Sequence, residues 1–418
     1  MAGPYAGLRV VEFGRFIAAP YAAQLLADGG SDVIKVEPLL GDNTRQMAPI
    51  VPGEGRQFLN KNRGKRSLAV DLGNEEVLAG VRTLVAGADV VIANFRPGLA
   101  EAMGLDYETV LDSNPRVIYA ENTAFGRLGP MADAPGVDIV MQAYSGLPVL
   151  DEHGPRPIAA PAIDYAAGLL MSWGIATALY HRERSGRGQK LDVSLLQAAL
   201  VLQNNQLNHL DAIDGWRNDY VEYLKTAFAD GKSWDEILDH REAIGPFAVA
   251  RAYYGMFRTA DGVIGIGGLS KPFQRSLLGL LEIEDPSVTE PNWESDDMNG
   301  HMRDMRTLVE TKLMEWPTAH WLTAIGATGV PVAEYHTQEQ MPDLEQAWAN
   351  DYFVRLEHEL LGGLTVVAPP VKFSDTPLAA DEASPVLGKH SREVLSEAGL
   401  EADAIERLVG EGAIVASD

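Results

Sequence analysis

The stretch of residues 159–193 constrains the fold of this chain more than any other part of its sequence. Residues 165–181 are apolar almost all round a helical wheel, and they therefore predict one long, buried helix. Small residues such as Gly168 would let neighbouring backbones approach that helix closely. The turn signal at 185–188, Ser-Gly-Arg-Gly, then leads directly into a predicted strand at 189–193.

Asp164 stands directly before this apolar helix, in a position that suits an N-cap. From the local pattern alone, capping is the simpler interpretation, because Asp is one of the favoured cap residues. A carboxylate fixed at the mouth of a buried helix could also act as a nucleophile. Both interpretations stay open at this level.

Short apolar strands alternate with helical stretches through the first half of the chain. The predicted strands are 8–13, 31–36, 68–72, 89–93 and 117–121, with helices starting at Pro20 and near 75–86 and 107–113. This alternation indicates an α/β fold with a doubly wound parallel sheet. The first turn, 14–19, lacks the glycines of a dinucleotide-binding fingerprint, which argues against NAD. A polar connection at 211–245 and a smaller unit that reaches about residue 330 follow.

Composition and charge exclude several classes of function. The 418 residues carry a formal charge of −25, which argues against nucleic acid or an anionic membrane as a partner. The absence of cysteine excludes disulfides, thiolate zinc sites and a cysteine nucleophile. No histidine pair has metal-ligand spacing, so we expect no metal. We find neither a signal peptide nor an apolar run of membrane-spanning length, and we therefore expect a cytoplasmic protein.

Two further segments are candidates for ligand binding. Residues 61–67, which read Lys-Asn-Arg-Gly-Lys-Arg-Ser, form the densest basic cluster in this acidic chain. They are either a solvated loop before a strand or a site for phosphate groups. Asn94 and Phe95 follow a predicted strand at the end where open α/β sheets bind their ligands. Phe95 could stack on a purine or belong to the core.

Taken together, these segments resemble the class III CoA-transferase family, which is also called the formyl-CoA transferase and 2-methylacyl-CoA racemase superfamily. The resemblance includes the Asn-x-x-Lys-Arg-Ser run from Asn62 and the Asn-Phe-Arg-Pro-Gly run from Asn94. The other matching segments are 8–20, 32–37, 126–130, Asp164 with its helix, 185–189 and 385–390. Each motif is short, but their order and spacing extend nearly from end to end.

The resemblance implies a Rossmann-like large domain with an inserted smaller α+β domain. The implied parts are 1–215 for the N-terminal part of the large domain, 216–330 for the connection and small domain, and 331–418 for the returning C-terminal part. It also implies a homodimer whose chains are interlocked like rings, with the active site between the large domain of one chain and the small domain of the other. Asp164 falls at the family's catalytic aspartate. The positions that fall where the family holds CoA are Arg15, Phe16, Lys65, Arg66, Asn94 and Phe95.

The predicted function is CoA transfer from an acyl-CoA thioester to a small carboxylic acid, through mixed anhydrides and an aspartyl-CoA thioester at Asp164. Ile17 replaces the glutamine of the formyl-CoA branch, which argues against formate or oxalate as the natural acid. A 2-methylacyl-CoA racemase is the nearest alternative, and it is opposed by Val137, which stands where that branch has histidine. A non-catalytic CoA-binding dimer is a second alternative, opposed by the intact Asp164.

Overall fold

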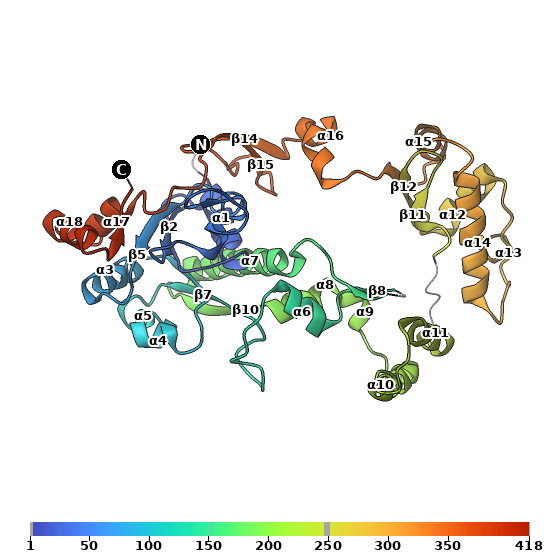
Figure 1. Ribbon diagram of the computed structural model, residues 1–418, viewed down its shortest axis with the longest axis horizontal. Helices are drawn as coiled ribbons and strands as arrows, with labels where there is room; N and C mark the ends of the chain where they lie inside the picture. The colour runs from blue at the N-terminus through green and yellow to red at the C-terminus, as the bar shows by residue number, and fades with distance from the viewer. Residues whose placement is uncertain (1–2, 152, 246–250, 418) are drawn as a thin grey trace. The chain divides into compact units, whose positions relative to one another are not determined.

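The computed structural model describes residues 3–151, 153–245 and 251–417, which divide into two compact units (Figure 1). The larger unit comprises Met1–Val149, Arg156–Asn208 and Glu345–Asp418, and the smaller comprises Leu150–Pro155 and His209–Leu344. The unit boundaries therefore lie near 208 and 344, whereas the sequence placed them at 215 and 330.

A seven-stranded sheet forms the centre of the larger unit, with the strand order β10-β7-β6-β1-β2-β5-β16. Its strands are β1 (Arg9–Glu12), β2 (Asp32–Glu37), β5 (Arg66–Val70), β6 (Val90–Ala93), β7 (Ile118–Thr123), β10 (Gln189–Ser194) and β16 (Ile414–Val415). All neighbours run parallel except β16, which pairs antiparallel with β5. The predicted mixed α/β fold with a large parallel sheet is confirmed.

Helices cover both faces of this sheet, which explains why its strands are continuous apolar runs. On one face, α1 (Ala18–Asp28) and α7 (Ala162–Ser185) share a buried cluster with alternate strand residues. On the other face, α3 (Glu75–Ala86), α17 (Ser391–Glu397) and α18 (Ala402–Gly410) pack against the intervening ones. The C-terminal segment therefore completes a core that the N-terminal segment begins.

The contact between α1 and α7 depends on a glycine. A Cβ atom on Gly168 would lie 2.8 Å from the carbonyl oxygen of Ala18 and 3.1 Å from the ring of Tyr21. Only glycine allows the two helices to approach this closely. The contact fixes the first turns of α7 beside the start of α1, and hence beside the loop that follows β1.

One part of the prediction for this helix is wrong. Although α7 was expected to be buried all round, the side chains of Leu169, Trp173 and Tyr180 are exposed, Trp173 by 69%. With 24 residues, α7 is also long and apolar enough to cross a membrane by length and composition alone, contrary to the expectation from the sequence. That is weak evidence for a membrane span, because the core helix of a soluble protein passes the same test.

The remaining elements of the larger unit are short. They are η1 (Asn43–Arg45), β3 (Pro49–Val51), β4 (Glu54–Gly55), α2 (Arg56–Leu59), α4 (Leu99–Met103), α5 (Tyr107–Ser113), α6 (Asp138–Ser145), α8 (Leu195–Leu202), α9 (Asn204–Leu207), α16 (Glu345–Ala349), β14 (Phe353–His358) and β15 (Gly362–Val367). A further hairpin, β8 (Val149–Asp151) with β9 (Gly154–Arg156), lies where the chain leaves and re-enters this unit. The loops around η1 and α2 contribute residues to the candidate active site.

The smaller unit contains an antiparallel sheet of β11 (Tyr254–Arg258), β12 (Val263–Gly267) and β13 (Val332–Glu334). Its helical elements are α10 (Gly215–Ala227), α11 (Trp234–Ile244), α12 (Lys271–Leu281), α13 (Pro286–Thr289), α14 (Met298–Leu313), α15 (Thr318–Gly326) and η2 (Gln338–Asp343). Because β13 pairs with β12, the chain stays in this unit beyond residue 330, where the sequence had placed its end.

Candidate active site

Asp164 is the third residue of α7, inside its first turn, and it is not the cap of that helix. The capping group is Asp138, whose Oδ2 accepts hydrogen bonds from the backbone nitrogens of Ile163 at 2.9 Å and Asp164 at 3.3 Å. Among the described residues, no group donates a hydrogen bond to the Asp164 carboxylate. The capping interpretation is therefore wrong, and the side chain of Asp164 is left available for chemistry.

Asp138 is held firmly in its capping role. Its Oδ1 accepts a hydrogen bond of 2.6 Å from the amide of Gln142, one turn along α6. The same amide group is fixed by the backbone of Ile158, through bonds of 2.8 and 3.0 Å. Both oxygens of Asp138 are thus engaged, and the chain that enters α7 is tied to α6.

The surroundings of Asp164 favour its neutral form. Burial raises its pKa to about 7, the negative charge of Asp138 adds to the increase, and Lys61 opposes it. Asp164 consequently changes its charge near neutral pH, as a group with an acid–base or nucleophilic role commonly does.

Lys61 is a buried cation whose charge acts on this carboxylate. Its residue surface is only 2% exposed. Burial lowers its pKa to about 8, and the charges of Asp42 and Asp164 act in the opposite direction. The sequence placed Lys61 in the basic cluster but did not connect it with Asp164.

The loop after β1 brings together four of the predicted CoA-binding residues. The side-chain amide of Asn94 accepts from the backbone nitrogen of Arg15 at 3.2 Å and donates to its carbonyl oxygen at 3.1 Å. Phe95 packs on Phe13, with ring centroids 5.1 Å apart. These residues follow β1 and β6, the adjacent strands at which the sheet order reverses, and such a switch point is the usual ligand position in open α/β sheets.

Phe16 has an uncommon backbone conformation in this loop. Its φ angle is +67°, in the left-handed region that a side chain other than glycine rarely adopts. Its backbone nitrogen contacts Oδ1 of Asp42 at 3.4 Å, and its side chain is exposed. Outliers of this kind persist where the surrounding structure imposes them, and they are concentrated at functional sites.

The basic cluster is buried, so its interpretation as a solvated loop is wrong. The ammonium of Lys65 donates to Glu12, to Asn62 and to the carbonyl of Pro20, each at 2.8 Å. An ammonium has three N–H groups, and all three are therefore engaged.

Arg66 is likewise committed to carboxylates. Its guanidinium forms ion pairs with Asp32, Glu393 and Glu397 at 2.6 to 3.1 Å. The assignment of Lys65 and Arg66 to CoA binding stays a prediction, and the structure gives both side chains a role in holding the larger unit together.

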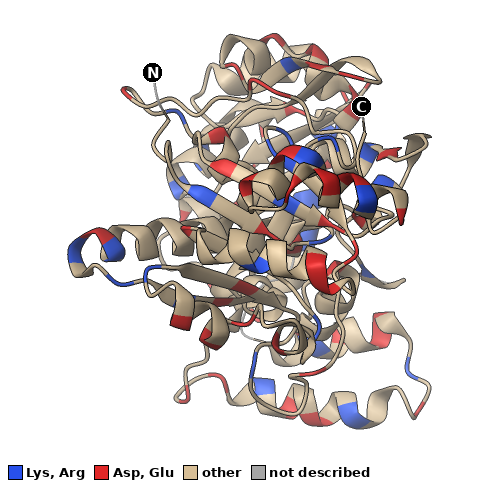
Figure 2. Cartoon of the chain, turned by 90° about the vertical axis from the view of Figure 1, so that its left-hand side faces the viewer, with Lys and Arg blue, Asp and Glu red and all other residues tan. Residues whose placement is uncertain are grey.

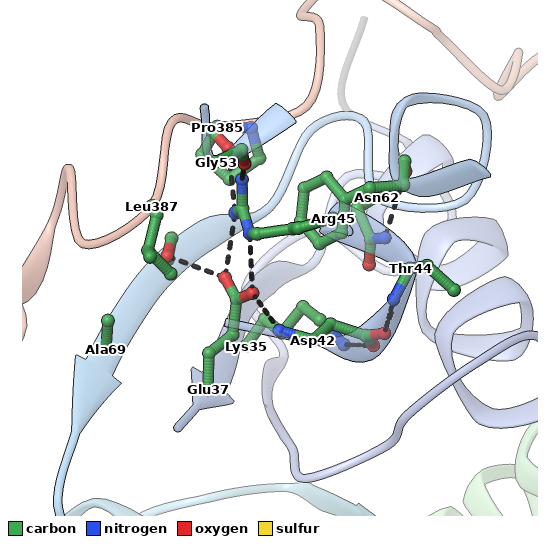
Figure 3. Close-up of polar contacts among 12 residues, drawn as sticks. Lys35, Glu37, Asp42, Thr44, Arg45, Gly53, Asn62, Ala69, Pro385 and Leu387 are labelled. Atoms are coloured by element: carbon green, nitrogen blue, oxygen red, sulfur yellow. Dashed lines mark hydrogen bonds and ion pairs between the residues drawn. The ribbon is translucent and has the colours of Figure 1, made fainter. Parts of the chain in front are cut away.

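Sequence reasoning missed a network of buried charges (Figure 3), which includes Asp42, the residue that accepts from the backbone nitrogen of Phe16. Lys35 forms ion pairs with Glu12 at 2.9 Å and with Asp42 at 3.1 Å. Arg45 pairs with Glu37 at 2.7 Å and with Glu54 at 2.8 Å. The available signal was the presence of charged residues within the apolar strands β1 and β2. Glu12 and Glu37 are the last residues of β1 and β2, and Lys35 lies inside β2.

Charged residues elsewhere are mixed in sign. Figure 2 shows Lys and Arg interspersed with Asp and Glu along the helices in view, rather than gathered in one basic patch. An anionic ligand must therefore be held by particular local groups against an acidic background.

Comparison with known proteins places this architecture in a family. Residues 5–391 match the model of CoA-transferase family III. The chain is 35% identical over 410 residues to the succinate–glutarate CoA-transferase of Agrobacterium fabrum, covering 94% of this chain and 95% of the relative. It is 32% identical over 380 residues to the acetyl-CoA:oxalate CoA-transferase of Acetobacter aceti, covering 89% of this chain and 90% of the relative.

Solved structures agree with this placement. A CAIB/BAIF family protein from Brucella suis superimposes with a TM-score of 0.75 at 31% identity, covering 95% of this chain and all of that one. Rv3272 from Mycobacterium tuberculosis superimposes with a TM-score of 0.74 at 28% identity, covering 93% of this chain and 98% of that one. The match extends over both compact units. The chain belongs to CoA-transferase family III.

Proposed function

We propose that this enzyme moves CoA from an acyl-CoA thioester to a free carboxylic acid, with Asp164 as the covalent carrier. The observation that supports the assignment of Asp164 is its carboxylate, which lies in the first turn of a helix that another residue already caps. A side chain relieved of the capping role can react, and the helix N-terminus opposes in part the burial that favours its neutral form.

The proposed reaction exchanges one thioester for another. The Asp164 carboxylate attacks the donor thioester carbonyl, forms a mixed anhydride and releases CoA thiolate. The thiolate attacks the Asp164 carbonyl, leaving an aspartyl-CoA thioester and the free donor acid. The acceptor carboxylate then reverses these two steps. Because anhydrides and thioesters hydrolyse, the site must exclude water while they exist.

We place the CoA moiety at the switch point of the sheet, on the loops that carry Arg15, Phe16, Asn94 and Phe95. Three features support this: the exposed Arg15 and Phe16 side chains, the amide clamp from Asn94, and the position of ligands in open α/β sheets. Lys65 holds the last residue of β1, Glu12, just before the first of these loops. Arg66 pairs instead with Asp32 at the start of β2.

An activity screen tests the proposed function. We expect the purified enzyme to transfer CoA from at least one of succinyl-CoA, acetyl-CoA and a longer acyl-CoA to an acid in a panel of mono- and dicarboxylates. Succinate and glutarate come first, because relatives that carry those names match nearly the whole chain. Thioester hydrolysis without transfer to any acid would contradict the proposal.

Racemisation is disfavoured by the groups around Asp164. Exchange at an α-carbon requires acid–base groups on both of its faces. Val137 cannot carry a proton, and both oxygens of its neighbour Asp138 are occupied by the helix cap and Gln142. We expect (S)-2-methylacyl-CoA in deuterated buffer, without acceptor acid, to gain no enzyme-dependent α-deuterium by mass spectrometry. Exchange at a rate near turnover would establish the racemase instead.

We propose that the chain works as an interlocked homodimer, as the family resemblance implies. The exposed apolar side chains along α7 support an interface there, because Leu169, Trp173 and Tyr180 would leave water on association. Interlocked chains cannot separate without unfolding, so native mass spectrometry is expected to show dimer even at nanomolar concentration. A folded monomer that increases on dilution would contradict interlocking.

A further inference from the structure

The first turn of α7 is held from outside the helix. Its N-cap position is occupied by Pro161, whose side chain has no hydrogen-bond acceptor. Two backbone nitrogens of this turn donate to backbone carbonyls, at 2.8 and 3.2 Å. The other two, those of Ile163 and Asp164, donate to Oδ2 of Asp138 on α6. The direction in which the Asp164 side chain leaves the helix therefore depends on where α6 holds one carboxylate oxygen.

Gln142 fixes both this carboxylate and the chain that enters α7. Its residue surface is only 2% exposed. Its Nε2 donates to Oδ1 of Asp138 at 2.6 Å and to the carbonyl of Ile158 at 3.0 Å, and its Oε1 accepts from the backbone nitrogen of Ile158 at 2.8 Å. Both N–H groups and the carbonyl of the amide are therefore engaged. α6 itself is anchored by Met141, which is fully buried in a cluster shared with the start of α7.

The amide of Gln142 supplies something that shape alone cannot. Oδ1 of an ionised Asp138 can only accept a hydrogen bond, and this residue is 9% exposed, so the donor has to come from inside the protein. A buried carboxylate oxygen without a donor is costly, and Asp138 would then turn toward water or take up a proton. Either change displaces Oδ2, and with it the two backbone nitrogens at the start of α7.

The proposed reaction depends on the position of Asp164 in each of its steps. The carboxylate must first reach the thioester carbonyl of the donor, and its own carbonyl must then be open to the CoA thiolate. Reacting atoms have to meet at about 3–3.5 Å in a defined direction, and a displacement of about 1 Å can lower the rate about a hundredfold. A nucleophile on the first turn of a helix is therefore sensitive to whatever fixes that turn.

We propose that Gln142 is a positioning residue of the acyl-transfer site, which directs Asp164 through the cap that Asp138 forms on α7. Its amide is fully engaged by Asp138 and Ile158, so it acts on the reaction only through them. Because one amide holds both partners, the cap and the entry to the helix move as one unit. The inference rests on the proposed function, and it adds to that function the residue that sets the direction of the nucleophile.

Gln142→Met tests this role, because methionine keeps the length of the side chain and removes all three hydrogen bonds. We expect kcat to fall about tenfold or more while KM for acyl-CoA changes less than about threefold, because the proposed CoA site lies on the loops after β1 and β6. The matched control is Gln203→Met. Gln203 is a second buried glutamine, and it ties α6 to α8 through the carbonyls of Ser145 and Ala199, each at 3.1 Å. Its removal leaves Asp138 untouched and should leave kcat unchanged.

Gln142→Glu gives a signature that a merely structural role would not. The new carboxyl group replaces the amide that donated to Asp138 at 2.6 Å, and two carboxyl groups so close share one proton, because they cannot both ionise readily. While the proton is shared, the pair keeps the wild-type charge and a donor for Oδ1, but its loss at high pH lets repulsion displace Asp138. The ratio of variant to wild-type transfer rate should therefore fall about tenfold or more between pH 6.5 and pH 9. The other titratable groups around Asp164, which are Lys61 and Tyr165, are the same in both enzymes.

The measurement is the rate of transfer from succinyl-CoA to glutarate, or between the best pair from the activity screen, at saturating substrates across this pH range. The Tm of each variant at both ends of the range shows whether the rates refer to folded enzyme, and if Gln142→Met does not fold, the Gln142→Glu ratio decides alone. A folded Gln142→Met enzyme with wild-type kcat, or a Gln142→Glu ratio that is the same at every pH, would overturn the inference while leaving CoA transfer intact. Absence of transfer in the wild type would instead overturn the proposed function.

Discussion

Asp164→Asn is expected to abolish CoA transfer while leaving the chain folded. Loss of a covalent nucleophile lowers kcat by about a thousandfold or more, since nothing nearby can replace the bond that it forms. The assay is transfer from the best acyl-CoA donor to the best acid. Asp112→Asn, at an exposed position of α5, is the control and should keep wild-type activity.

The stability of the same variant distinguishes a nucleophile from a structural residue. The pKa of Asp164 is raised from 3.8 to about 7 in the folded chain, so its ionisation reduces stability as the pH rises through that window. Asparagine removes this charge, and the Tm of Asp164→Asn at pH 8 should equal or exceed that of the wild type. A clearly lower Tm would show that Asp164 supports the helix instead.

The same pKa sets the pH dependence of the wild-type enzyme. Only the ionised carboxylate attacks a thioester, so kcat/KM for acyl-CoA should rise with pH and level off above about 7. A profile that is already flat between pH 5 and 8 would mean that Asp164 is ionised throughout and that its surroundings do not favour the acid.

Of the substitutions considered, Arg45→Met is expected to lower the free energy of unfolding most. The guanidinium of Arg45 pairs with Glu37 and Glu54, donates to the carbonyl of Pro385 and lies 3.5 Å from the ring centroid of Phe58. Methionine would leave two buried carboxylates without their cation, and breaking a buried pair in this way costs about 3–5 kcal/mol. Urea unfolding at pH 7 measures this loss.

Lys372→Met is the control for that experiment. It removes an exposed lysine that pairs with Asp351, and exposed pairs contribute about 0–1 kcal/mol. The ion pair between Arg45 and Glu37 should also make the stability loss of Arg45→Met depend on pH. Although burial favours the neutral acid, Arg45 lowers the pKa of Glu37, so this stabilisation should be present at neutral pH and lost in acid. An Arg45→Met loss as small as that of Lys372→Met would show that the network is dispensable.

The sequence predicted the sheet of the larger unit well because its strands are buried on both faces. All six predicted strands of this sheet appear within about two residues of their expected ends, and the helix predicted at 75–86 matches α3. β16 was missed because two residues, Ile414 and Val415, form too short a run to show periodicity. The exposed side of α7 was missed because an apolar helix looks the same whether the chain itself or a partner covers it.

The sequence also singled out Asp164, whose role stays a prediction, and two loops that the structure brings together at the switch point, but it misjudged the surroundings of the charged residues. The pattern before an apolar helix could not show that Asp138, 26 residues earlier, provides the cap. The cluster at 61–67 did not indicate which cations have acceptors for all their N–H groups, because Lys65 contacts Glu12 and Pro20 only in the folded chain. Lys61 and Lys65 are of the same residue type, and tertiary contacts alone distinguish them.

The central claim is that Asp164 carries CoA during turnover, and peptide mass spectrometry tests it most directly. The enzyme is incubated with its acyl-CoA donor, treated with hydroxylamine to convert a thioester into a stable hydroxamate, and digested. We predict a donor-dependent hydroxamate on the peptide at Asp164, absent without acyl-CoA and absent from Asp164→Asn. Continued transfer with no modification at Asp164, or with the modification on another carboxylate, would contradict the account.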